Sequence, residues 1–343
     1  MSLEARPQAL RLVGGFMITQ AMGIVARLGI ADLVAERPRS VVELAAESGV
    51  GVDALARVVR ALASVGVFRT DDGLVRNTAV GDLLREDAPG SIRSLAAMSS
   101  GEHYRAWGDA YESIRSGEPA FPRVFGSPYF DWLAEHPQEA DGFNRAMAAG
   151  TVARRDALVA RDWASVESVV DVGGGTGSLL AALLVAHPHL RGVIVDLPHA
   201  CDDAQATIVA AGLEARCAFV EGSFFERVPD GADVYILSKI LHDWDDEQAV
   251  AILRVCRDAT RSSSRLLIVD TVLRPGDEPD WGKVLDLHML VMLGGRERSE
   301  AQWRVLLAES GFALDRVVPG GPGTFLEAAP DEPGRLPSTG ASD

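Results

Sequence analysis

The stretch VVDVGGGTGSLLAALL, residues 169–184, decides the fold of this chain. Its β-branched start is typical of a buried parallel strand, and its Leu- and Ala-rich end is typical of a helix. The glycines between them, from Gly173 to Gly177, allow a tight turn and a close approach of backbone to ligand. A strand, a glycine loop and a helix in this order predict a nucleotide-type cofactor beyond the strand ends.

Similar β-rich runs continue along the chain and alternate with helical segments. The expected strands are residues 168–173, 192–197, 217–222, 232–238 and 265–271. Apolar runs of this kind, separated by helices, predict an α/β domain with an open, doubly wound, Rossmann-like parallel sheet.

The glycine spacing and one acid bear on the cofactor. In the dehydrogenase pattern G-x-G-x-x-G, counted from Gly173, the third glycine falls on Ser178, and the run fits G-x-G-x-G instead. Asp171 precedes the loop, where a carboxylate repels a pyrophosphate and suits an ammonium or sulfonium group. Both features favour S-adenosylmethionine (SAM) over NAD, and Asp196 stands where a ribose-hydroxyl acceptor is expected.

Composition limits the class of protein. Of the 343 residues, 47% are apolar and 24% charged, as in ordinary globular proteins of one or two domains. The net charge of −16 disfavours nucleic acid and anionic membranes as partners. The three cysteines are far apart and fit no metal-ligand pattern, so we expect free thiols and no metal. The N-terminus lacks the features of a signal peptide, so a cytoplasmic location is expected, and the Arg-rich, Lys-poor composition suggests a bacterial source.

Residues 1–100 have a helical pattern that begins with a long amphipathic helix. Ser40 with Glu43 forms a predicted capping box, and Asp53 is expected to cap the next helix. Asp-Asp-Gly at 71–73 predicts a hairpin turn. Two helices and a hairpin predict a winged helix, which is compatible with DNA binding or with a structural role in dimerisation. The acidic surroundings and the lack of base-reading side chains favour dimerisation.

The domains predicted from these patterns are residues 1–100, mostly helical, and residues 101–330, the cofactor-binding domain. The second domain includes an aromatic-rich helical segment, 101–165, which is expected to contribute to substrate binding. Residues 331–343 have too few apolar side chains to pack and are expected to be disordered.

The segment KILHDWDDE, residues 239–247, follows an expected strand and has two interpretations. Its acids can start a helix that runs through the next residues. His242 can instead be a catalytic base at the carboxyl edge of the parallel sheet. The segment alone favours the helix start, so the rest of the chain must decide.

Six motifs in order carry a resemblance that covers nearly the whole chain. They are DVGGGTG, VDLPHA, EGSFFERVP, LSKILHDWDDE, LLIVDTVL and LGGRERSEAQWRVLLAESGF. Together they closely resemble the SAM-dependent O-methyltransferases of the plant caffeate/flavonoid type and their bacterial relatives in aromatic polyketide and secondary-metabolite pathways. The resemblance implies a homodimer joined by the N-terminal domain, SAM as cofactor with S-adenosylhomocysteine as product, and a small aromatic substrate methylated on a phenolic hydroxyl.

The resemblance also implies a role for particular residues. His242 matches the general base, and Asp270 and Glu297 match the acids that orient it. Positions matching cofactor contacts are Asp171, Gly173, Gly175, Asp196, Leu197, Gly222, Ser223, Phe224, Ser238, Lys239 and Asp243. Positions matching or neighbouring the acceptor pocket are Trp107, Asn144, Met147, His288, Met289 and Met292.

One departure and three alternatives accompany this interpretation. Ser223 stands where the family has an acid that holds the adenine, so the charge of that contact is missing. A family member diverted to hydroxylation or a pericyclic step is one alternative. The others are a dehydrogenase and a winged-helix regulator that senses a ligand.

Overall fold

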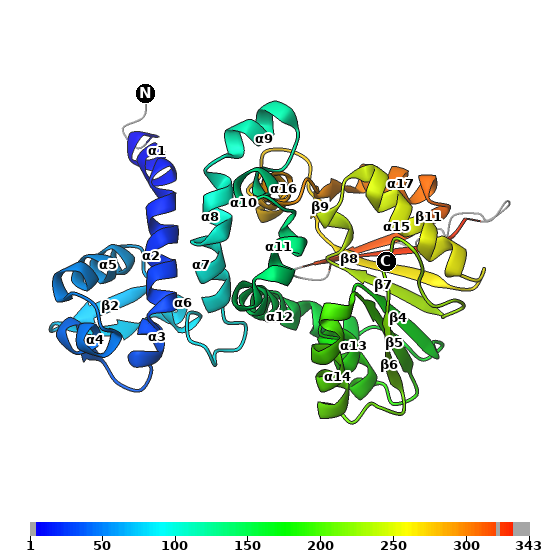
Figure 1. Cartoon of the computed structure of the whole chain (residues 1–343), viewed down its shortest axis with the longest axis horizontal. Helices are drawn as coiled ribbons and strands as arrows, with labels where there is room; N and C mark the ends of the chain where they lie inside the picture. The colour runs from blue at the N-terminus through cyan, green and yellow to red at the C-terminus, as the bar shows by residue number, and fades with distance from the viewer. Residues whose placement is uncertain (1–4, 320–322, 332–343) are drawn as a thin grey trace, which may run out of the picture. The chain divides into compact units, whose positions relative to one another are not determined.

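The chain divides into two compact units. The computed structural model describes residues 5–319 and 323–331. Residues 1–108 and 130–150 form the first unit, and residues 109–129 and 151–343 form the second (Figure 1). The predicted boundary near residue 100 stays a prediction. The predicted disordered tail, apart from Asp331, lies outside the described residues.

The first unit is mostly helical. Its helices are α1 (Ala5–Val13), α2 (Gly15–Arg27), α3 (Ile30–Leu33), α4 (Val41–Ser48), α5 (Val52–Ser64), α6 (Ala79–Asp82), α7 (Arg93–Ser99), α8 (Glu102–Trp107), most of α11 (Tyr129–Glu135) and the first part of α12 (Pro137–Val159). The prediction of one long N-terminal helix is wrong, because α1 and α2 are bent by 46° at Gly14. Adjacent glycines weaken a helix and are a common site of kinks.

The winged-helix prediction is confirmed. Ser40 and Glu43 form the capping box of α4. The strands β2 (Phe68–Asp71) and β3 (Leu74–Asn77) form the hairpin, and β1 (Arg39–Ser40) pairs with β3. Asp53 was predicted to cap α5, but Gly51 is the N-cap, and Asp53 lies in the first turn, where its charge still favours the helix.

Among the described residues, no single helix is long and apolar enough to cross a membrane. The bent pair α1 and α2 meets the length and composition test only when the two helices are taken together.

The second unit is built on a seven-stranded sheet of order β11-β12-β8-β7-β4-β5-β6. The strands β8, β7, β4, β5 and β6 are parallel to one another. At the β8 side of the sheet, β12 and then β11 are added in antiparallel orientation. The strands are β4 (Ser168–Val172), β5 (Arg191–Asp196), β6 (Cys217–Glu221), β7 (Val234–Ser238), β8 (Arg265–Asp270), β11 (Phe312–Pro319) and β12 (Thr324–Pro330). The five parallel strands were predicted, and the antiparallel pair was not.

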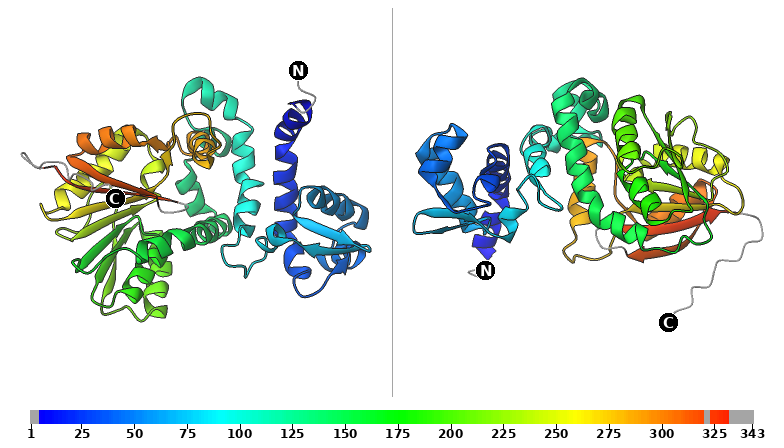
Figure 2. Two further views of the ribbon diagram at one scale, coloured as in Figure 1. Left: turned by 180° about the vertical axis from the view of Figure 1, so that it is seen from behind. Right: turned by 90° about the horizontal axis from the view of Figure 1, so that it is seen from below.

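Helices cover both faces of this sheet (Figures 1 and 2). On one face α13 (Ser178–Ala186), α14 (Cys201–Ala210) and the end of α12 pack on residues such as Val169 and Ile236. On the other face α15 (Asp246–Ala259) and α17 (Glu300–Glu309) pack on Val170 and Leu237. The chain order reverses between β4 and β7, so the fold is doubly wound and places its switch point there.

Candidate active site

His242 lies on a short 3-10 turn, Leu241–Asp243, between β7 and α15. Both interpretations of the acidic segment describe part of it. Asp245 caps α15 by accepting a hydrogen bond from the backbone N–H of Gln248, and Asp246 lies in the first turn of that helix. His242 comes before the helix, at the carboxyl edge of the sheet beside the switch point. The acids that start the helix therefore leave the histidine available for chemistry.

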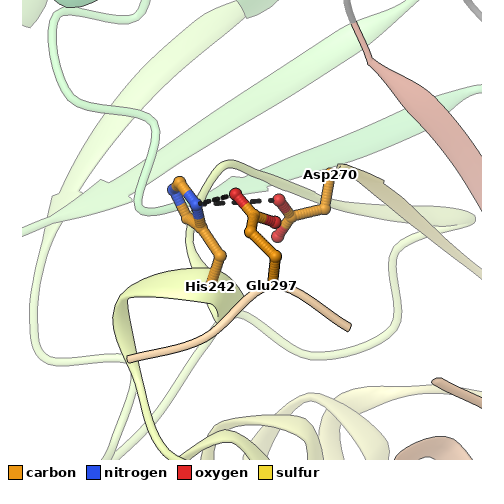
Figure 3. A group of neighbouring side chains, drawn as sticks. All are labelled: His242, Asp270 and Glu297. Atoms are coloured by element: carbon orange, nitrogen blue, oxygen red, sulfur yellow. Dashed lines mark hydrogen bonds and ion pairs between the residues drawn. The ribbon is translucent and has the colours of Figure 1, made fainter. Parts of the chain in front are cut away.

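Two buried carboxylates face the imidazole of His242 (Figure 3). Glu297 Oε1 lies 2.9 Å from Nδ1, and Asp270 Oδ1 lies 3.9 Å from the same nitrogen. Asp270 ends β8, and both acid side chains are fully shielded from solvent. A carboxylate on Nδ1 fixes the proton there and leaves Nε2 as the basic nitrogen.

A small parallel sheet brings Glu297 to Asp270. β9 (Val272–Leu273) follows Asp270 closely, and β10 (Arg298–Ser299) begins directly after Glu297. These two strands pair in register, Arg298 with Val272. Two acids that are 27 positions apart in sequence are thus held next to each other by backbone pairing.

Arg298 and Gly295 hold the histidine turn in place, and neither was predicted. The fully buried Arg298 donates to Leu241 O at 2.8 Å, Trp244 O at 2.9 Å and Asp246 Oδ1 at 2.9 Å. A Cβ at Gly295 would lie 2.2 Å from the carbonyl oxygen of His242, so only glycine permits this approach. Both residues stand inside the GGRERSE motif, but their contacts depend on the tertiary fold.

Lys239 also belongs to this group of charges. Its Nζ donates to Asp270 Oδ1 at 3.0 Å and to Thr271 Oγ1 at 2.6 Å, and it lies 3.5 Å from Glu297 Oε1. Lys239 was predicted as a cofactor contact, which stays a prediction, and its side chain contacts the acids. The cation that this carboxylate pair holds is the Lys239 ammonium.

The surroundings set the protonation of the site. Burial lowers the pKa of His242, but Asp270 and Asp243 outweigh burial, so the pKa is raised. Asp243 Oδ1 lies 3.4 Å from Nε2, and burial raises the pKa of this carboxyl to about 6. His288, on α16 (Trp281–Met292), has its pKa lowered to about 4 by burial and by His242. His288 is therefore neutral near pH 7, and His242 is the stronger base.

The predicted cofactor residues gather at the same edge of the sheet. Gly173, Gly175 and Gly177 have φ of 71°, 54° and 72°, which favour glycine. Asp196 Oδ2 accepts from the backbone N–H of Gly175 at 2.7 Å, and its Oδ1 accepts from Leu197 N at 2.7 Å. The loop after β4 and the acid that ends β5 are thereby connected.

The remaining predicted cofactor residues lie after β6 and at the end of β7. Gly222 N donates to Asp196 O at 3.0 Å, and the Phe224 ring lies close to Gly173. Ser223 Oγ accepts from the backbone N–H of Phe225 at 3.2 Å. Ser238 ends β7. Four parallel strands thus direct these predicted residues to one edge of the sheet.

Asp171 gives the loop its charge. This carboxyl is 2% exposed, and its Oδ2 has no hydrogen-bond partner among the described residues. Burial, and next the nearby Asp196, raise its pKa to about 7. A buried acid of this kind beside a glycine cradle fits the ammonium and sulfonium groups of SAM.

The predicted acceptor residues divide between the two units. Met289 and Met292 on α16 are buried, and His288 on the same helix interacts with His242. Trp107, Asn144 and Met147 belong to the first unit, and their place at the acceptor stays a prediction.

The sequence interpretation also missed Arg154 in the last part of α12. Its Nη2 donates to Thr151 Oγ1 at 3.0 Å, and its Nε has no partner among the described residues. Burial lowers the pKa of this guanidinium, and Asp270 acts in the opposite direction. A guanidinium in this environment can hold a carboxylate, although its distance from the motifs in sequence gave no signal.

These features define a class: a Rossmann-like protein with a glycine loop at the switch point of its sheet and a histidine flanked by two buried acids. Comparison with known proteins gives the family. Residues 107–313 match the O-methyltransferase domain, and residues 10–87 match the O-methyltransferase dimerisation domain. The chain belongs to the SAM-dependent O-methyltransferase family.

Relatives match over almost the full length. The chain is 45% identical to the phenazine O-methyltransferase PhzM of Lysobacter antibioticus, over 94% of this chain and 95% of that protein. It is 40% identical to O-demethylpuromycin-O-methyltransferase of Streptomyces alboniger, over 95% and 89%. The crystal structure of LaPhzM superposes with a TM-score of 0.89 at 44% identity, over 95% and 99%.

A further solved structure bears on ligands. The O-methyltransferase NcsB1 from neocarzinostatin biosynthesis, in complex with SAM and 2-hydroxy-5-methyl naphthoic acid, has a TM-score of 0.81. It is 35% identical and covers 91% of this chain and 95% of that one.

Proposed function

We propose that this enzyme methylates a phenolic hydroxyl of an aromatic secondary metabolite, with His242 as general base. The contact between His242 Nδ1 and Glu297 Oε1, 2.9 Å, carries the proposal, because it leaves Nε2 to take the phenol proton. SAM, when bound, supplies a methyl group on a sulfonium sulfur. Asp171 and Asp196 hold the cofactor, and Arg154 is suited to its carboxylate.

The proton transfer limits the mechanism. A phenol has a pKa of about 10 and a free histidine about 6.5, so complete transfer before attack costs about 5 kcal/mol. The raised pKa of His242 reduces this difference. If the phenol loses its proton while its oxygen attacks the methyl carbon, most of the remaining free-energy cost of proton transfer is avoided. Holding the oxygen in position for attack supplies much of the rate.

The buried base favours an oxygen acceptor. Two relatives are named as N-methyltransferases, one for 8-amino-8-demethylriboflavin and one for phenazine-1-carboxylate. A neutral amine attacks first and loses its proton afterwards, so it gains little from a base in place. A phenol gains directly from His242, Asp270 and Glu297. Relatives that act on hydroxybenzoate and naphthoate acceptors support the aromatic class.

The test is methyl transfer from SAM to a panel of phenolic acids, polyhydroxylated aromatics and matched aromatic amines, followed by mass spectrometry. We expect a one-methyl gain on a hydroxyl, and His242→Ala is expected to lower kcat/KM by about 10²–10⁴. The matched control is His189→Ala, because His189 is exposed and its contacts are with the carbonyl of Trp163 and the ring of His187, away from the sheet edge that carries His242. Transfer that persists in His242→Ala removes His242 from the role, and SAM binding without any transfer favours diverted chemistry.

We also propose that the enzyme is a homodimer through its first unit. Exposed apolar side chains gather on α1 and α2: Leu10, Leu12, Val13, Phe16 and Met17 are all at least half exposed. Apolar surface of this kind is typical of an interface, and the segment lies largely in the region that matches the dimerisation domain. Light scattering should give twice 36.5 kDa, and Leu12→Glu with Met17→Glu should lower the mass. A wild-type mass of 36.5 kDa would contradict the proposal.

A further inference from the structure

The backbone at Lys239 is unusual for a lysine. Among the described residues, Asp72 and Lys239 are the non-glycine residues with positive φ, at 50° and 58°. Asp72 lies in a hairpin turn beside Gly73, and aspartate tolerates this conformation. Lysine has no such tolerance, and glycine would fit the position without strain. The position therefore holds a lysine for its side chain.

The fold aims that side chain at the acid pair. The backbone N–H of Lys239 donates to Val269 O at 3.0 Å, which joins the end of β7 to the end of β8. From there Nζ reaches Asp270, Thr271 and Glu297. The Lys239 side chain is only 16% exposed, so solvent screens this interaction weakly.

The charges around His242 explain why a cation is needed. Asp270 and Glu297 contribute two buried negative charges beside Nδ1. Without a cation they would favour a proton on the imidazole at rest, and an imidazolium cannot accept another. With Lys239 present, Asp270, Glu297 and Lys239 together carry one net negative charge, which a proton received by His242 offsets. Other groups face the same imidazole from its own turn and from α16: Asp243 and His288.

We propose, resting on the function proposed above, that Lys239 is a positioning residue. Its ammonium holds Asp270 and Glu297 against His242 and supplies the positive charge that keeps His242 available as a base. Lys239 does not touch the acceptor hydroxyl in this role. It acts through the two acids.

The chain offers a matched control, because Lys239 and Lys283 are its two lysines. Lys283 Nζ donates to the carbonyl oxygens of Gly276 and Glu278 and neutralises no carboxylate in these contacts. The experiment compares wild type with Lys239→Met, Lys239→Arg and Lys283→Met. It measures kcat/KM against pH from about 5 to 9, and the titration of the His242 ring by carbon NMR in the full-length enzyme with S-adenosylhomocysteine. Lys239→Gln serves if Lys239→Met does not fold, as judged by thermal melting.

The direction of the expected shift follows from the positive charge of Lys239. Loss of this cation raises the pH at which His242 releases its proton, by about one unit or more. The acid limb of the Lys239→Met profile therefore moves to higher pH, and activity recovers in part at alkaline pH. Lys239→Arg keeps the limb near wild type, and Lys283→Met leaves it unchanged. A limb that stays in place while the rate falls at every pH would reduce Lys239 to a structural role and overturn the proposal.

The two readouts separate this proposal from the proposed function. If wild type methylates no acceptor, the proposed function fails, and the NMR titration still decides the charge arrangement. The proposal is supported if the His242 titration shifts in Lys239→Met but stays near the wild-type value in Lys239→Arg. An unmoved titration overturns it, whatever the activity.

Discussion

Asp171 and Asp270 are both buried aspartates near the carboxyl ends of parallel strands in the same sheet. Their pKa values are nevertheless shifted in opposite directions. Asp171 on β4 is 2% exposed and Asp270 on β8 is 0% exposed. Burial and Asp196 raise the pKa of Asp171 to about 7. Burial also acts on Asp270, but Lys239 and His242 outweigh it and lower the pKa.

The difference lies in the partners. Asp270 Oδ1 accepts from Lys239 Nζ at 3.0 Å and from Thr271 N at 2.8 Å. Asp171 Oδ2 has no partner among the described residues. Asp270 Oδ2 also has no partner among the described residues, so the difference is the cation: the β8 end carries its own, Lys239. The β4 end is an acid without a cation, which is the complement of a positively charged cofactor.

The largest effect expected from the contrast between Asp171 and Asp270 is a loss of turnover in the variant Asp270→Asn. The substitution keeps the shape but removes the charge that favours the imidazolium of His242, and it leaves Lys239 with one carboxylate. We expect kcat to fall about a thousand-fold, ~4 kcal/mol of barrier, while the Kd for SAM changes little. Asp171→Asn is the matched comparison, and its main effect should be on the Kd. A similar fall of kcat in both variants would remove the distinction between the two strand ends.

The next effect is on stability, in Asp171→Asn. A carboxyl whose pKa is higher in the folded than in the unfolded state destabilises the fold as pH rises, here from about 4 to about 7. The variant should therefore be more stable than wild type at pH 8, by about 4 kcal/mol, and nearly equal to it at pH 4. Asp270 has the opposite sign, because its stabilisation is present above the unfolded pKa and is lost as pH falls. Denaturant unfolding of the cofactor-free enzyme at both pH values measures this, and a pH-independent difference would contradict it.

The contrast also shows what the sequence could predict. The strand at residues 168–172, the glycine loop and the parallel order follow from local patterns of apolar residues and glycines. His242, Asp270 and Glu297 were predicted by resemblance, and the structure brings all three side chains together. That meeting could not be derived from spacing, because it depends on the pairing of β9 with β10.

The features that the sequence did not reveal have physical causes as well. Lys239 was predicted as a cofactor contact, and its hydrogen bond to Asp270 could not be foreseen, because it depends on a left-handed backbone at Lys239. Arg298 is a charged residue that the fold buries fully, and Arg154 is partly buried, and a charged side chain in such a place is uncommon. The antiparallel strands β11 and β12 were not predicted, and the charged Asp315 and Arg316 interrupt the apolar run of β11.

The smallest effect sharpens the cofactor side, at Ser223. Its Oγ accepts one local hydrogen bond, from Phe225 N, and supplies no charge. In Ser223→Asp one carboxylate oxygen can keep that bond while the other accepts from the adenine amino group. A charge-assisted hydrogen bond at this partly exposed position should lower the Kd for S-adenosylhomocysteine a few-fold, ~1 kcal/mol or less. Ser223→Asn is the neutral control for calorimetry. If Asp and Asn give the same Kd, the missing charge is irrelevant here, and the ring of Phe224 beside Gly173 carries the adenine contact instead.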